Sequence, residues 1–138
     1  MSTRTFALVF GIVFLLITAS GLIPGLLQHR MHDGVAVDAM SGDALGLFPV
    51  NLVHTLVHLL FGVWGLAASR SLGAAKGYAK AVGIAYVILM IMGLVPGLDT
   101  MFGMAPLYGN DVWLHLLLAL GGIYFGWIHK DRVADRRA

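Results

Sequence analysis

The sequence predicts an all-α integral membrane protein in which four transmembrane helices form one bundle. Three observations support this fold class. Of the 138 residues, 59% are hydrophobic, only 12% are charged, and the apolar residues are gathered into four long runs. Soluble domains carry about 25% charged residues, so this chain is not expected to be soluble alone. Residues 1–138 are therefore predicted to form a single transmembrane domain whose first partner is the lipid bilayer.

The four apolar runs are each long enough to be a transmembrane helix. A helix needs about 20 apolar residues to cross the hydrocarbon core of a bilayer. The predicted spans are residues 5–27, 45–68, 78–98 and 112–129. The charged segment that follows, 130–138, is predicted to be a tail outside the bilayer.

The distribution of Lys and Arg predicts the orientation of the helices. Loops on the cytoplasmic side carry an excess of these residues. Arg70, Lys76 and Lys80 surround the second connection, and segment 130–138 holds four more basic residues, whereas the first connection sets Arg30 against three aspartates. Both termini are therefore predicted to be cytoplasmic. Because the basic residues flank apolar segments and form no basic face, no nucleic acid partner is predicted.

The chain contains an internal repeat. The sequence GLIPGL at residues 21–26 returns as GLVPGL at residues 93–98. Further along each copy, His54 corresponds to Asp111, and His58 corresponds to His115. Two helical hairpins are therefore predicted, at about 5–68 and about 78–129, related as parallel repeats about an axis along the membrane normal.

Each copy carries signals for a helix end and for the next helix start. Proline followed by glycine is expected to terminate the first helix of each hairpin. Asn51 and Asn110 are predicted to be the N-caps of the second and fourth helices.

Polar residues form a stripe on each even-numbered helix. Asn51, His54 and His58 fall at spacings of three and four, and Asp111 and His115 repeat the spacing of four. Such spacings put side chains on one helix face. The two stripes are expected to face each other across a polar pocket in the outer half of the bundle.

Glycines continue both stripes toward the cytoplasmic side. These are Gly62 and Gly65 on the second helix, and Gly122 and Gly126 on the fourth. Small residues let transmembrane helices approach closely. The second and fourth helices are therefore expected to touch each other in their inner halves.

The facing polar side chains suggest a metal site. His54, His58, Asp111 and His115 together offer three imidazoles and one carboxylate. This donor set suits zinc best, although imidazole also binds copper and iron. Asn51 is expected to support a ligand histidine from outside the coordination sphere.

Three alternatives remain open from the residues. The same network can order helix packing, or an interface with a second copy or a partner membrane protein, in a structural or accessory subunit. Haem b can be held between His58 and His115. His29 and His32 can form a second metal site in the outer loop with Asp33. No constellation of catalytic residues is recognised, so the sequence assigns no enzymatic activity.

Two segments carry a family resemblance. PVNLVHTLVHLLFG at residues 49–62 and DVWLHLL at residues 111–117 resemble the bacterial domain-of-unknown-function family 4383. The resemblance covers nearly the whole chain. It implies a small four-helix protein of the bacterial cytoplasmic membrane and implies no activity.

Overall fold

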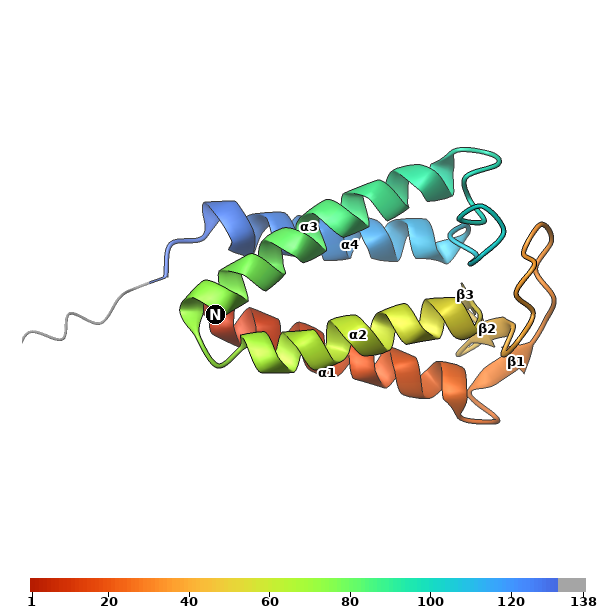
Figure 1. Cartoon of the computed structure of the whole chain (residues 1–138), viewed down its shortest axis with the longest axis horizontal. Helices are drawn as coiled ribbons and strands as arrows, with labels where there is room; N and C mark the ends of the chain where they lie inside the picture. The colour runs from red at the N-terminus through yellow and green to blue at the C-terminus, as the bar shows by residue number, and fades with distance from the viewer. Residues whose placement is uncertain (132–138) are drawn as a thin grey trace, which may run out of the picture.

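The computed structural model describes residues 1–131, which form helices and one small sheet. Two antiparallel helix pairs make up most of the molecule (Figure 1). Their helices are α1 (Thr3–Leu22) with α2 (Leu52–Ala68), and α3 (Leu72–Leu94) with α4 (Asn110–Ile123). The last helix continues as a short π-helical turn, η1 (Tyr124–Ile128). The predicted tail 130–138 lies outside the described residues except for its first two positions.

Three of the helices are long and apolar enough to cross a membrane. They are α1, α3 and α4 together with η1. The shorter apolar helix, α2, has 17 residues. The predicted span 45–68 therefore begins too early, because the residues before Asn51 form a turn and a strand. The mainly helical character is confirmed.

A three-stranded antiparallel sheet lies at one end of the helices, which the all-α prediction missed. Its strands are β1 (Leu27–His29), β2 (Gly42–Ala44) and β3 (Phe48–Val50), in the order β1-β2-β3. Leu27, Ala44 and Val50 are buried together beneath it. The strands have three residues each, which is too short to produce a recognisable alternation of apolar and polar residues.

Capping side chains define the helix starts. Asn51 accepts a hydrogen bond from the backbone N–H of His54 at 3.0 Å, so its predicted role as the N-cap of α2 is confirmed. The prediction for Asn110 is wrong. Gly109 precedes α4 without a side-chain cap, and the Asn110 amide instead donates to the carbonyl of Leu47.

The glycines of each stripe lie where the two helices of one pair contact each other. The expected contact between the inner halves of α2 and α4 is therefore wrong. Gly62 and Gly65 lie against Gly11 of α1, and Gly122 lies against Gly83 of α3. Among the described residues, α2 and α4 make few backbone contacts with each other. The small residues therefore hold each hairpin together.

Replacing Gly65 with alanine should destabilise the protein by about 1 to 3 kcal/mol through overpacking. The added Cβ would lie 2.8 Å from Gly11 Cα and 2.8 Å from the Tyr78 hydroxyl. Gly77→Ala is the matched control, because a Cβ at Gly77 meets no atom within 4 Å and alanine favours helix. Thermal unfolding in detergent should show a lower midpoint for Gly65→Ala alone. Equal midpoints in the two variants would refute the close packing of α1 against α2.

The start of α1 meets the residues that follow η1 at the opposite end of the helices from the sheet. The Asp131 carboxylate accepts hydrogen bonds from the backbone N–H of Thr3 at 2.7 Å and from the Thr3 hydroxyl at 2.6 Å. Lys76, near the start of α3, lies 4.0 Å from the same carboxylate. The start of α1, the start of α3 and the residues after η1 therefore share one end of the molecule.

Candidate metal site between α2 and α4

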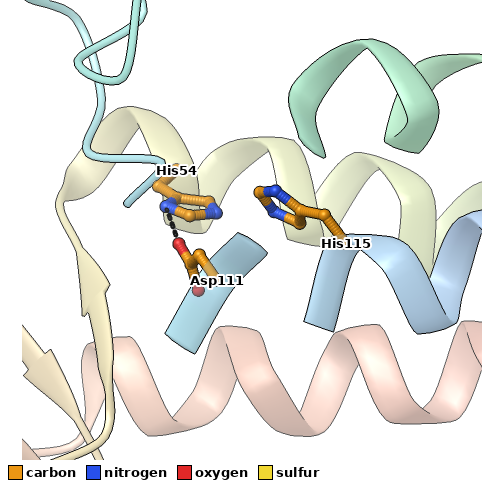
Figure 2. A group of neighbouring side chains, drawn as sticks. All are labelled: His54, Asp111 and His115. Carbon is orange, nitrogen blue, oxygen red and sulfur yellow. Dashed lines mark ion pairs between the residues drawn. The ribbon is translucent and has the colours of Figure 1, made fainter. Parts of the chain in front are cut away.

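Three potential metal ligands converge between α2 and α4, near the sheet end of the helices (Figure 2). His54 comes from the first turn of α2, and Asp111 and His115 come from the first two turns of α4. One nitrogen or oxygen atom from each lies within 4.8 Å of the other two, and all three residues are buried. His54 Nδ1 lies 3.6 Å from Asp111 Oδ2.

Four polar atoms of this group lack partners in the described part of the chain. His54 Nδ1, Asp111 Oδ2 and both ring nitrogens of His115 make no hydrogen bond there. Buried polar groups in folded proteins are nearly always hydrogen-bonded. The site therefore calls for a further partner that can satisfy two imidazoles and a carboxylate together.

The three potential ligand atoms lie slightly further apart than they would around one bound ion. Zinc ligands at about 2.0 to 2.1 Å from the ion lie about 3.4 Å apart in a tetrahedral site. The three atoms must therefore approach one another by up to about 1.4 Å to bind one zinc ion in this geometry.

Asn51 fixes the position of His54 and closes the sheet end of the site. Its amide group donates hydrogen bonds to the carbonyls of Val37 at 2.9 Å and Met104 at 2.7 Å. Its carbonyl is occupied by the His54 backbone. Asn51 therefore joins two loops to the start of α2, instead of supporting a histidine ring as the sequence suggested.

His58 lies beside the three-residue group and not within it. Its ring centroid is 4.6 Å from that of His54, and the ring stacks on Phe14. Tyr86 of α3, which the sequence analysis did not single out, packs edge-on against His115 with centroids 5.2 Å apart. The structure thus brings together three of the four predicted ligands and adds an aromatic neighbour.

The outer-loop histidines do not form a second group of ligands. His32 is buried, and Nε2 donates to the Gly42 carbonyl at 3.0 Å, since a carbonyl can only accept. Its Nδ1 then accepts from the Tyr108 hydroxyl at 2.8 Å. Burial, together with nearby aspartates, raises the pKa of Tyr108 against an opposing effect of Arg30, so this hydroxyl keeps its proton. His29 is exposed on β1.

The fold and site define a helical protein with three helices able to span a membrane and a buried group of two histidines and one aspartate. The model of the family described as "Domain of unknown function (DUF4383)" matches residues 4–128, so the chain belongs to this family. The predicted family is confirmed. Searches of curated proteins and of solved structures found no significant match.

Proposed function

We propose that this chain is a multi-pass membrane protein that binds one transition-metal ion through His54, Asp111 and His115. The observation that supports it most strongly is the convergence of these three buried ligands, each of which has at least one ligand atom without a hydrogen-bond partner in the described chain. Zinc is the first choice, because catalytic zinc sites combine three such ligands with an open position. Iron(II) also uses two histidines and one carboxylate, and copper binds imidazole.

The helix surfaces support a location within a bilayer. Large apolar side chains are exposed on all four helices, among them Leu16, Leu60, Ile88 and Leu117, which are between 52% and 70% exposed. Such contiguous apolar surface is rare on soluble monomers. With 17 residues, α2 is at the lower limit for a span, so we propose four spans in a single domain of the bacterial cytoplasmic membrane.

The contact between the start of α1 and the residue that follows η1 by three positions supports an even number of spans. Thr3 and Asp131 are hydrogen-bonded to each other, and the basic residues of the α2 to α3 connection lie at the same end. We propose that this end is cytoplasmic. The two hairpins are then parallel repeats, with His54 and Asp111 both in the first turn of the second helix of a hairpin.

The orientation can be tested with two single cysteines, because the natural sequence contains none. Ala36→Cys, in the loop beside the sheet, should react with a membrane-impermeant thiol reagent in intact cells. Ala74→Cys, at the start of α3, should react only after the cells are opened. Both positions are exposed, so a difference in labelling reports the side of the membrane. Labelling of residue 74 in intact cells would contradict the proposed orientation.

The metal proposal is tested by elemental analysis and absorption spectroscopy of the protein purified in mild detergent. About one metal ion per chain is expected, without the strong Soret band of haem. The cavity beside the site has a volume of about 30 Å3, which favours an ion over haem. Absence of any stoichiometric metal would support the alternative structural network, and a Soret band would support haem between His58 and His115.

A further inference from the structure

The start of α1 lies beside the end of α2, at the end of the helices away from the sheet (Figure 1). The two segments form a depression with a volume of about 360 Å3, which is lined by Ser2, Arg4, Thr5, Leu8 and Ser69. None of these residues belongs to the candidate metal site. The wall contains hydroxyl groups and a guanidinium, and it contains no carboxylate. The depression therefore offers a ligand hydrogen-bond donors and positive charge.

Arg4 is held in place by one of its donors and keeps the others for a ligand. Its Nε donates a hydrogen bond to the Ser69 carbonyl at 2.8 Å, which fixes the guanidinium against the end of α2. Among the described residues, the two terminal nitrogens of Arg4 make no hydrogen bond and no ion pair. A guanidinium presents its N–H groups in a planar fork that matches two oxygens of a phosphate. Arg4 is therefore oriented to bind a phosphate group.

Two hydroxyl groups in the wall supply a further donor. Ser2 Oγ and Thr5 Oγ1 are 2.9 Å apart, so one of these hydroxyls donates a hydrogen bond to the other. The hydroxyl that accepts this bond keeps its own proton for a second partner, whichever of the two it is. Both residues are exposed. One hydroxyl proton is therefore available to a ligand that also contacts Arg4.

An apolar strip follows Arg4 on the same face of α1. It consists of Leu8, Ile12 and Leu16, which continue from Arg4 at intervals of four residues, and this spacing puts side chains on one helix face. The three side chains are between 42% and 65% exposed. Leu8 lies about 6 Å further along α1 than Arg4, toward the hydrocarbon core in the proposed orientation. This face therefore combines donors at the membrane surface with an apolar strip deeper in the bilayer.

We propose that the depression binds the phosphate group of an anionic phospholipid, with an acyl chain against the apolar strip. This inference rests on the proposed position in the membrane and is independent of the metal site. A zwitterionic headgroup carries an ammonium group beside its phosphate, and no carboxylate lines the depression to receive it. The nearby carboxylate of Asp131 is already occupied by Thr3. The charges at this end therefore favour a headgroup with a net negative charge.

Native mass spectrometry of the detergent-purified chain tests the lipid site. The probe is an equimolar mixture of phosphatidylglycerol and phosphatidylcholine with identical acyl chains, and the wild type should bind phosphatidylglycerol preferentially. Arg4→Gln should weaken the binding of phosphatidylglycerol at least about tenfold, because it removes hydrogen bonds from a charged group. Excess inorganic phosphate should leave the bound lipid in place, since phosphate alone makes no contact with the apolar strip.

Thr5→Glu tests the same site in a variant that should keep the fold. Ser2 is the N-cap of α1 and accepts a hydrogen bond from the backbone N–H of Thr5, so glutamate at residue 5 completes a capping box. Its carboxylate also adds a negative charge to the wall of the depression. Thr5→Glu should therefore lose phosphatidylglycerol to about the same extent as Arg4→Gln, with no decrease in its thermal unfolding midpoint.

Arg70→Gln is the matched control, because Arg70 is an exposed arginine at the same end that does not line the depression. It should bind phosphatidylglycerol as the wild type does. An equal loss in Arg70→Gln and Arg4→Gln would show a general attraction to positive charge and overturn the site. Equal binding of the two lipids by the wild type, or displacement of phosphatidylglycerol by inorganic phosphate, would also overturn it.

The metal content of the same preparations separates this inference from the proposed metal site. All these variants should contain as much metal as the wild type, since the depression and the metal site lie at opposite ends of the helices. Metal-loaded wild type without a preference for phosphatidylglycerol would overturn the lipid site alone. Selective lipid binding by a wild type that holds no metal would overturn the metal site alone.

Discussion

Replacing His115 with alanine is expected to lower the metal content from about one ion per chain to a tenth of that or less. The loss follows because His115 is one of only three groups in the described chain that converge on the site. Even residues outside the coordination sphere typically contribute about 10- to 100-fold to metal affinity. Asp111→Asn should have a comparable effect, since it removes the charge and keeps the size. Elemental analysis after removal of free metal measures both.

Two variants control for unspecific effects. Leu117→Ala changes a 66% exposed residue on the same helix, and His29→Ala removes an exposed histidine outside the site. Both should retain the metal.

His58→Ala tests whether the site has four ligands, as predicted from the sequence, or the three that converge in the structure. The structure predicts that this variant keeps its metal, and loss would make His58 a ligand. Undiminished metal in His115→Ala would contradict the site.

Replacing Asn51 with alanine is expected to have the largest effect on stability, about 2 to 4 kcal/mol. Loss of an N-cap costs about 1 kcal/mol. Loss of both amide donations leaves the carbonyls of Val37 and Met104 without their partner, at about 1 kcal/mol or more each. The variant should unfold at a lower temperature in detergent. It should also bind metal more weakly, because the first turn of α2 carries His54.

Asn110→Ala is the matched control for Asn51. It removes the same side chain at the start of α4, where Asn110 is exposed and makes one hydrogen bond, to Leu47. A loss of at most about 1 kcal/mol is expected. Equal destabilisation by the two substitutions would show that Asn51 does not join the loops to α2 as described.

The spacing of residues within each helix identified the three residues that come together. It also included a fourth, His58, that lies outside the group. The interval of four between Asp111 and His115 puts both on one face of α4, and His54 was correctly placed opposite them. His58 follows His54 by the same interval, so it lies about 6 Å further along α2. The same interval separates Asp111 from His115, which both belong to the group, so spacing alone does not exclude His58. The crossing of the helices decides which level of α2 faces α4.

Other features left no usable pattern in the sequence. Gly62 and Gly65 identify a face of α2 that permits close packing, but a face does not identify its partner, which is α1. Tyr86 lies within a continuous apolar run, where a buried aromatic residue looks the same whether it fills the core or lines a site. The strands are fixed by pairing between residues such as Leu27 and Ala44, which are far apart in the chain.

The most direct test of the metal site is the X-ray absorption spectrum of the metal bound to the purified protein. The site predicts nitrogen and oxygen neighbours at about 2.0 to 2.2 Å, with the outer-shell scattering that imidazole rings produce. This scattering should diminish in any residual metal of the His115→Ala variant. A spectrum with oxygen neighbours alone and no imidazole scattering would contradict binding by His54 and His115.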